Sequence, residues 1–210
     1  MRLNMMKLLT GDINRMRAVP RFATYHMTET ENVAEHTAIV GVYCVFILEW
    51  VRVYFYDTPG RDTEYKIDEA RVLRRALIHD LEECRTGDLI RVFKTDNGAL
   101  ARHIHAVGTT QFMGMAEELI PDSDTVVGNL TREWVDARDK TPEGCIVDFA
   151  DYLAAIAFLM RQRALGNTAN ATKAARQTLV EHNKLYDGAE FDFIRPLIND
   201  AQIEALRVLT

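Results

Sequence analysis

The sequence predicts an all-α protein that folds as a single compact helical domain. Glycine (11) and proline (5) are scarce, and 48% of the residues are hydrophobic against 27% charged. This mixture excludes a disordered or low-complexity chain. Apolar residues recur at helical spacing, and no segment alternates strongly between apolar and polar residues as a half-buried strand does. A length of 210 residues suits one domain, so we assign residues 1–210 to it.

The first half of the chain contains two clear helical segments. Thr30 is the expected N-cap of a long apolar helix that ends near residue 56, and the turn residues of 57–63 follow it. Asp68 starts the next helix, which carries one apolar face. Residues 84–96 have a loop composition, with Gly87 as the expected hinge.

The second half is predicted to be helical almost throughout. Pro142 stands where a first-turn proline is tolerated, and Gly166 follows the same helix as a C-terminal cap. This helix is apolar nearly all round, which is typical of a helix at the centre of a core. The expected helices cover about 99–119, 124–137, 142–165, 169–186 and 190–208.

The composition also bears on location and partners. The net charge is −6, which argues against a protein that coats nucleic acid. The three cysteines are far apart and never form a CxxC pair, so we expect no disulfide framework and a reducing compartment. The N-terminus lacks a signal-peptide core, and the longest apolar run, 38–48, is short for a membrane helix. We therefore expect a cytoplasmic protein, or one in the host cytoplasm if a phage encodes it, without a membrane partner.

Charged residues inside apolar segments are the candidates for chemistry. Asp148 and Asp151 lie three residues apart in the apolar central helix, and a buried carboxylate needs a metal, an arginine or hydrogen bonds. The adjacent pair His79-Asp80 ends the second helix, and His36 lies early in the long apolar helix. Each of these alone is weak. Together, two imidazoles and two carboxylates suit a divalent ion with positions left open for water.

Three motifs resemble those of the HD-domain phosphohydrolases, and specifically the YfbR-like 5'-deoxynucleotidases. The stretch 30–36 (TENVAEH) resembles the TENVxEH motif of that group, and 79–89 (HDLEECRTGDL) is similar to its HDxxExxTGDL motif. Ala150-Asp151 resembles the short third motif. The resemblance covers about residues 14–166, whereas the helices of 167–210 are too dissimilar to carry residues over. It implies a metal-binding HD-domain fold in which His36, His79, Asp80 and Asp151 are the ligands and Asp148 is a neighbour.

The resemblance also implies accessory roles. Glu83 would position or deprotonate the attacking water, and Asp88 would bind the sugar or assist the leaving oxygen. Arg21 would hold phosphate oxygens, and Phe22 would lie against the deoxyribose and penalise a 2'-hydroxyl. The group carries tryptophan where this chain has Phe22, which leaves the sugar preference open. From its charge and place in the chain, Lys94 is a further candidate at the mouth of the site.

The expected activity is that of a metal-dependent phosphohydrolase, in which activated water cleaves the 5'-phosphate ester of a deoxynucleotide. The closest motif match favours a deoxynucleoside monophosphate, giving a deoxynucleoside and phosphate. A triphosphohydrolase of the dATP type uses the same machinery and is the first alternative, because the compact chain also resembles small phage dATP triphosphohydrolases. A non-catalytic nucleotide-binding HD domain is the second. The metal is left open among zinc, cobalt, manganese and magnesium. The family habit implies a homodimer or larger homo-oligomer, and no nucleic-acid polymer as partner.

Overall fold

The computed structural model describes residues 3–56, 66–89 and 98–209. All elements in these ranges are helical, and their only β-type pairing is an isolated bridge between Pro20 and Asn32. The α-helices are α1 (Met5–Thr10), α2 (Val33–Tyr56), α3 (Glu69–Ile78), α4 (Glu83–Thr86), α6 (Gly98–Leu119), α7 (Asp124–Val135), α8 (Pro142–Ala164), α9 (Thr168–Leu185) and α10 (Arg195–Leu209), with 3₁₀ helices η1 (Asp12–Ala18) and η2 (Ala189–Ile194). The predicted all-α class is confirmed.

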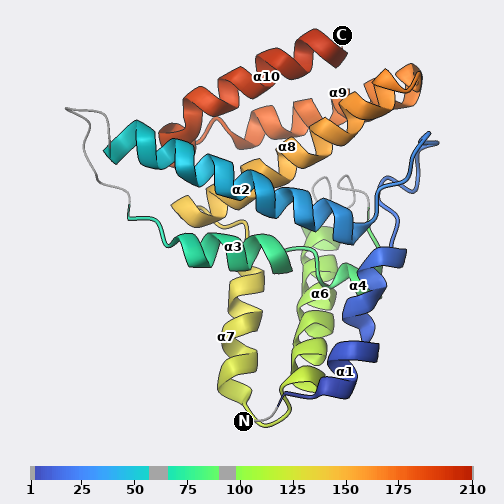
Figure 1. Cartoon of the computed structure of the whole chain (residues 1–210), viewed down its shortest axis with the longest axis vertical. Coiled ribbons are helices and arrows are strands. Elements are labelled where there is room, and N and C mark those ends of the chain that lie inside the picture. The colour runs from blue at the N-terminus through green and yellow to red at the C-terminus, as the bar shows by residue number, and fades with distance from the viewer. Residues whose placement is uncertain (1–2, 57–65, 90–97, 210) are drawn as a thin grey trace.

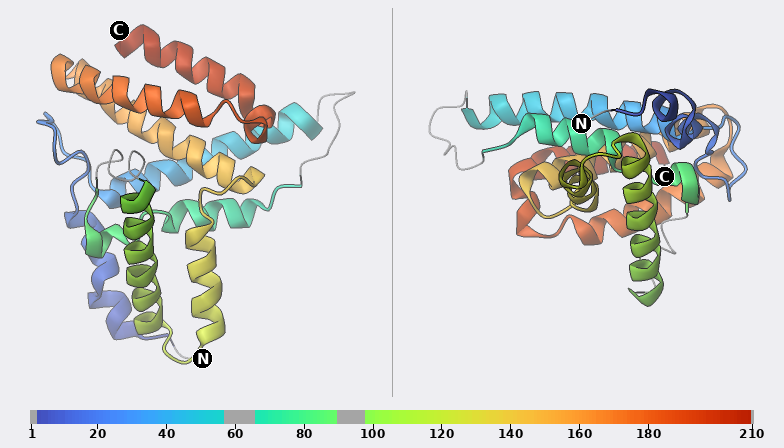
Figure 2. Two further views of the ribbon diagram at one scale, coloured as in Figure 1. Left: turned by 180° about the vertical axis from the view of Figure 1, so that it is seen from behind. Right: turned by 90° about the horizontal axis from the view of Figure 1, so that it is seen from below.

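The helices form two groups that meet around α3 and α8. In Figure 1, α2, α8, α9 and α10 run across the upper part of the molecule, and α1, α6 and α7 project downward. The views from behind and from below (Figure 2) show the same separation, with α9 and α10 on the opposite side of α8 from α2. The N-terminal segment is hydrogen-bonded to the lower group of helices, since the Asn4 amide donates to the Leu119 carbonyl at 2.8 Å. The metal-site candidates come from the elements where the two groups meet.

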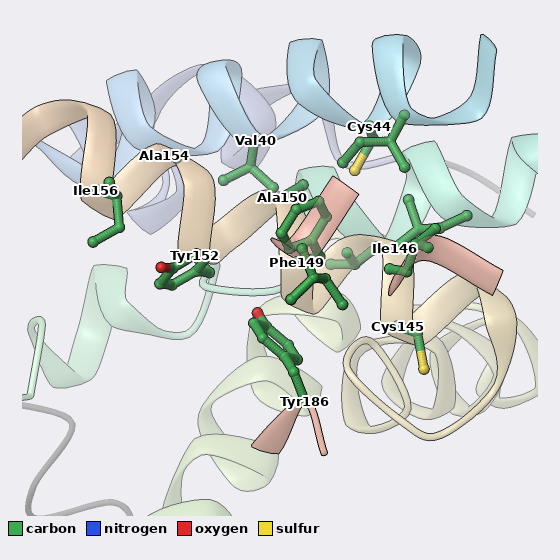
Figure 3. Close-up of a cluster of buried hydrophobic side chains, with 14 of the residues drawn as sticks. Val40, Cys44, Cys145, Ile146, Phe149, Ala150, Tyr152, Ala154, Ile156 and Tyr186 are labelled. Carbon is green, nitrogen blue, oxygen red and sulfur yellow. The ribbon is translucent and has the colours of Figure 1, made fainter. Parts of the chain in front are cut away.

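Helix α8 is the centre of the core. Thr141 caps it by accepting the Gly144 amide, Pro142 occupies its first turn, and Gly166 follows it with φ 92°. Nearly every side chain from Glu143 to Leu159 is buried, as the all-round apolar pattern predicted. Figure 3 shows Phe149 and Ala150 of this helix between Val40 of α2 and Tyr186. Burial on all sides makes any charged residue in this helix costly without a partner.

Helix α2 starts two residues later than the Thr30 cap predicts. Asn32 Oδ1 accepts the Glu35 amide at 3.0 Å, and Glu35 Oε2 accepts the Asn32 amide at 3.2 Å. This reciprocal pair is a capping box, and it makes Asn32 the N-cap. The prediction was wrong because Thr30 and Asn32 are both good cap residues, and only the reach of Glu35 decides between them. The first turn of α2 then presents His36 to the interior.

By length and composition alone, α2 could also cross a membrane, since the span Val33–Phe55 has a mean hydropathy of 1.8 over its best window. The sequence analysis judged the shorter run 38–48 and missed this. Val40, Cys44, Ile47 and Val51 lie on the face that packs against the core. Because the same helix carries the buried His36 toward α8, we interpret it as a core helix with an apolar outer face.

The segment between α3 and the site is partly helical. Asp68 caps α3 by accepting the Arg71 amide, and the helix ends at Ile78, so that His79 and Asp80 follow its last turn as predicted. Residues 84–96 were expected to be loop, but residues 83–86 form the single helical turn α4, which ends at Gly87 with φ 76°. Four residues are too few for a periodic signal to reveal. The predicted connection 56–66 and the loop residues 90–96 lie largely outside the described residues.

The end of the chain also differs from the prediction. The expected helix 190–208 is interrupted, because η2 covers Ala189–Ile194 and α10 begins only at Arg195. Phe191, Phe193 and Ile194 are all buried, a spacing that a 3₁₀ turn accommodates better than a single α-helical face. Pro196 then lies in the first turn of α10.

Candidate metal centre and active site

Four side chains that are distant in sequence converge at one buried point. His36 comes from α2, His79 and Asp80 follow α3, and Asp151 comes from the middle of α8. One potential ligand atom from each lies within 4.8 Å of all the others, and all four residues are buried. The structure thus brings together the four residues for which the sequence motifs imply metal ligation.

The inner oxygens of the two carboxylates face the imidazoles. Asp151 Oδ1 lies 3.0 Å from His36 Nε2, and Asp80 Oδ2 lies 3.1 Å from His79 Nε2 and 3.7 Å from His36 Nε2. The two imidazole rings are 5.6 Å apart between centroids. This places two nitrogen and two oxygen donors around one point, a set that suits zinc, cobalt or manganese.

Unsatisfied nitrogen atoms indicate that a cation fits here. His36 Nε2 and His79 Nε2 are both buried and lack an aligned hydrogen bond, although a carboxylate oxygen approaches each. His79 Nδ1 lies 2.7 Å from the Ala76 carbonyl, which can only accept, so this nitrogen carries the hydrogen and Nε2 is left to bind a metal. Donor atoms of a tetrahedral zinc ion are about 3.4 Å apart. The four donor atoms here lie within 4.8 Å of one another, so the side chains would move inward on binding such an ion.

The protonation states of His36, Asp80 and Asp151 also suit a cation. At His79, burial lowers the pKa of the ring, but the charges of Asp80 and Asp151 outweigh burial and raise it. Burial, followed by the charge of Arg21, lowers the pKa of His36 to about 4, so its ring is neutral at pH 7. Burial raises the pKa of Asp151, but the close approach of His36 Nε2 at 3.0 Å and the charge of Arg138 outweigh burial and hold the pKa well below 3.8. Burial also raises the pKa of Asp80, but the nearby His79 and the charge of Arg138 outweigh burial and lower it. Neutral imidazole and ionised carboxylate are the forms that bind metals.

Arg21 lies at the edge of this cluster. Its Nη1 is 3.0 Å from Asp80 Oδ2, and its side chain is 11% exposed. Burial lowers the pKa of Arg21, but the charges of Asp80, Asp151, Glu83 and Asp88 raise it well above the usual value. The guanidinium is therefore surrounded by the carboxylates of the site and stays charged.

Phe22 adopts an unusual backbone conformation next to Arg21. Its φ is 53°, and it is the only non-glycine residue with positive φ among the described residues. In this conformation its amide donates to Asp88 Oδ2 at 3.1 Å. Its ring stacks on Phe158 of α8, 5.2 Å between centroids. Such backbone strain is concentrated at functional sites, where the surrounding structure maintains it.

The other predicted residues are placed as follows. Glu83 is the first residue of α4 and is 1% exposed. Asp148 is buried one turn before Asp151 but is not in the four-residue cluster, and its charge acts on Arg138. Lys94 lies outside the described residues. The cluster thus includes Asp151 and leaves Asp148 beside it.

Two residues of the site were missed by the sequence analysis. Arg138, in the connection between α7 and α8, places Nη1 2.6 Å from Asp151 Oδ2 and Nη2 3.5 Å from Asp80 Oδ1. Glu31 is buried behind His36, with Oε2 3.8 Å from His36 Nδ1 and 3.4 Å from Arg21 Nε. Burial raises the pKa of Glu31 to about 7. Glu31 lies inside the TENVAEH motif, which was the available signal, whereas nothing in the sequence marks Arg138.

Three solved structures with similar folds are distant from this chain in sequence. An HD-domain phosphohydrolase of Listeria innocua is 17% identical, with a TM-score of 0.65 over 93% of this chain and 89% of that one. A protein of Pyrococcus furiosus is 20% identical, with a TM-score of 0.67 over 95% and 99% of the two chains. The HD phosphohydrolase DatZ of cyanophage S-2L, solved with dA and one catalytic Zn²⁺, is 17% identical, with a TM-score of 0.56 over 95% of each chain. These likenesses establish the HD-domain helical fold.

The family itself is identified by sequence. No curated protein sequence shows a significant match to the chain. The YfbR-like 5'-deoxynucleotidase family, however, matches residues 9–195. That range includes every element of the site described above. The chain therefore belongs to the YfbR-like family of HD-domain enzymes and is a metal-dependent phosphohydrolase.

Proposed function

We propose that the enzyme removes the 5'-phosphate from deoxynucleoside monophosphates. The observation that carries this proposal is the position of Arg21, whose guanidinium lies 3.0 Å from Asp80 in the four-residue cluster. A phosphate held by Arg21 is thereby next to the point where the four donor atoms converge. Guanidinium binds phosphate through paired, charge-assisted hydrogen bonds. The family match supports the same substrate class.

His36, His79, Asp80 and Asp151 are proposed to hold one divalent metal ion, for which zinc, cobalt, manganese and magnesium are candidates. When bound, such an ion acts as a Lewis acid and lowers the pKa of a water molecule toward 7. The protein's part is to fix the geometry. His79 is oriented by the Ala76 carbonyl, and Asp151 is held by the surrounding core of α8.

Glu83 is proposed to position the attacking water and to accept its proton. It is buried, it follows the His79-Asp80 pair by one helical turn, and its charge acts on Arg21. A carboxylate beside the phosphate site is in the right place for general base catalysis. This residue also separates the enzyme from a non-catalytic nucleotide-binding domain, which has no need for such a base.

Asp88 and Phe22 are proposed to bind the sugar side of the substrate. Asp88 is held beside the site by the Phe22 amide, which leaves its carboxylate close to Arg21. From there it can bind the deoxyribose or assist the leaving O5'. The ring of Phe22 is supported from behind by Phe158, and we propose that its other surface disfavours a 2'-hydroxyl. Lys94 remains a candidate for additional positive charge.

A triphosphohydrolase activity is the second candidate. The fold likeness to the phage phosphohydrolase solved with dA and Zn²⁺ favours it, because a dA-binding HD enzyme has a closely similar arrangement of helices. Both reactions attack the phosphorus next to O5'. They differ in whether phosphate or triphosphate leaves, so one assay separates them.

The test is a product assay on the purified protein. Each dNMP and dNTP is incubated with Zn²⁺, Co²⁺, Mn²⁺ or Mg²⁺, and the released phosphate, pyrophosphate and triphosphate are resolved by ion chromatography. We expect orthophosphate from dNMPs and no turnover by a Glu83→Gln variant. Release of triphosphate from dNTPs without dNMP turnover would establish the second candidate instead. Binding of dNMP without any hydrolysis would favour a regulatory domain.

We also propose a homo-oligomer that acts in the cytoplasm on free nucleotides and has no nucleic-acid polymer or membrane as partner. The acidic net charge of −6 supports this choice of substrate over a polymer. Large apolar side chains are exposed on the outer faces of α10, at Ile203 and Leu206, and of α2, at Phe46. Light scattering of the purified protein tests the oligomeric state.

A further inference from the structure

Arg138 is a charged residue of the site to which no motif assigns a role. It lies between α7 and α8, and its guanidinium reaches both aspartates of the cluster. Its contacts are with Asp151 Oδ2 and Asp80 Oδ1, whereas the oxygens that face the imidazoles are Asp151 Oδ1 and Asp80 Oδ2. Arg138 therefore occupies the outer oxygens of the two carboxylates and leaves the inner ones for a metal ion.

Arg138 and Arg21 lie on either side of one carboxylate. Arg21 Nη1 is 3.0 Å from Asp80 Oδ2, and Arg138 Nη2 is 3.5 Å from Asp80 Oδ1. Two guanidinium groups that share one carboxylate are close enough together to contact a single phosphoryl group.

The guanidinium of Arg138 is accessible and has donors to spare. Its side chain is 32% exposed, compared with 11% for Arg21. Its contacts engage two of the five N–H groups that a guanidinium carries. An anion arriving from solvent can therefore bind Arg138 without displacing it from the aspartates.

Charge balance adds a reason for an anion to bind here. Asp80 and Asp151 carry two negative charges, which one divalent ion neutralises. The positive charges of Arg21 and Arg138 then remain, and a phosphate monoester carries about −1.5 to −2 at pH 7. Glu83 and Asp88 act on Arg21, and Asp148 acts on Arg138, so these carboxylates offset part of the positive charge that the two guanidinium groups present to the phosphate.

The connection that carries Arg138 is fixed by its neighbour. Asp139 accepts from Arg75 Nη1 at 3.1 Å, and its side chain also bonds the Thr141 amide at 3.0 Å. Arg75 is buried in α3, so the connection is anchored to the helix that ends at His79. A fixed arginine costs less entropy to order when a ligand binds.

From these contacts we propose that Arg138 is a second phosphate-binding residue, which together with Arg21 grips the single phosphate next to the metal site. This inference rests on the proposed function, because it concerns the phosphate of the same substrate. It goes further by naming the residue that completes the phosphate site.

The experiment uses inorganic phosphate as the probe and Co²⁺ as the metal. Wild type, Arg138→Gln, Arg138→Lys and the control Arg132→Gln, an exposed arginine of α7, are loaded with Co²⁺. The visible Co²⁺ spectrum reports whether the metal site is intact, and calorimetry gives the phosphate affinity. We expect Arg138→Gln to keep its Co²⁺ spectrum and to bind phosphate about 10-fold more weakly, as the loss of one charged hydrogen bond predicts. The phosphate affinity of Arg138→Lys should lie between those of wild type and Arg138→Gln, because lysine keeps the charge but not the paired N–H donors of a guanidinium. The phosphate affinity of Arg132→Gln should match that of wild type.

Three results would overturn the inference. If phosphate affinity is unchanged in Arg138→Gln, or if wild type binds no phosphate, Arg138 is only an ion-pair partner of the aspartates. If Arg138→Gln loses or alters the Co²⁺ spectrum, its role is to position the ligands. Failure of the proposed function would be seen separately, as absence of dNMP hydrolysis by wild type, and the phosphate titration remains readable in that case.

Discussion

Two clusters of buried charge lie near each other in this enzyme and differ in one respect. In the first, around Arg75, the guanidinium donates to Glu133 at 2.9 Å, to Asp139 at 3.1 Å and to Thr141 at 3.2 Å. Among the described residues, no buried side-chain atom of this cluster lacks a partner. In the second cluster, around His36 and His79, buried imidazole nitrogens lack a hydrogen-bond partner.

The difference shows what separates a structural ion cluster from a ligand site. Burial of charge is common to both, and it costs free energy that partners must offset. The Arg75 cluster offsets that cost within the protein. The His36 and His79 nitrogens are left for something that the chain does not contain, and a divalent cation satisfies them. Incomplete hydrogen bonding, and not buried charge, therefore identifies the site.

The strongest test of this contrast is removal of one imidazole. We expect His79→Ala to lose the bound metal, about one ion per chain in wild type, and to lower activity by roughly 10³-fold, since several kcal/mol of charge stabilisation disappear. Metal analysis and a phosphate-release assay measure this. His103→Ala, on the exposed side of α6, is the control and should behave as wild type. Unchanged metal content in His79→Ala would place the metal elsewhere.

The matching change in the other cluster should act on folding. Arg75→Met leaves Glu133 and Asp139 without their main partner, so we expect the free energy of unfolding to fall by about 3 kcal/mol. Urea denaturation of the metal-free protein measures it, with the exposed neighbour Arg74→Met as the control. The contrast breaks down if Arg75→Met leaves stability intact.

A change at the border of the metal site should have a smaller effect. Glu31 faces His36 Nδ1 across 3.8 Å, and a carboxylate behind a ligating histidine orients the ring. We expect Glu31→Ala to weaken metal affinity by about 10-fold, the lower end for such partners, while Glu29→Ala, at an exposed glutamate paired with Arg161, leaves it unchanged. Chelator competition measures both. Equal metal affinities in the two variants would remove Glu31 from this role.

The pH dependence of the Arg75 cluster gives the finest test. Burial raises the pKa of Glu133, but hydrogen bonds from Arg75 and Arg71 outweigh it and hold the pKa below 4.5. A lowered pKa contributes stability above the unfolded value, and that contribution is lost as pH falls through the folded pKa. The stability difference between wild type and Arg75→Met should therefore be full at pH 7 and shrink below about pH 4.5. A difference that stays constant with pH would mean that Arg75 acts through packing alone.

Much of the fold was predictable because its signals are local. The N-cap Asp68, the first-turn Pro142 and the terminating Gly166 each act within one turn of chain, and the structure has them in those roles. The break between η2 and α10 was not predicted. It depends on the packing of Phe191 and Phe193 against other helices, and a periodicity argument on one segment does not include those partners.

The site was predictable to the extent that its residues lie in motifs. His36, His79, Asp80 and Asp151 were singled out by charge in apolar segments and by resemblance, and they converge in the structure. Arg138 carries no such signal. Its place depends on the connection between α7 and α8, which is set by Arg75 from a third segment. Contacts among three distant segments are a tertiary property that no single stretch of sequence encodes.

The left-handed backbone of Phe22 sets two demands against each other at one position. A non-glycine residue in this conformation costs about 1–2 kcal/mol, which glycine would recover. Glycine, however, would remove the ring that stacks on Phe158 beside the phosphate site. The ring also packs against the hydrophobic core, so its burial offsets the cost of the backbone conformation. Position 22 is thus a point where side-chain packing holds the backbone in a conformation that the residue alone disfavours, and where the proposed contact with the sugar would depend on the same ring.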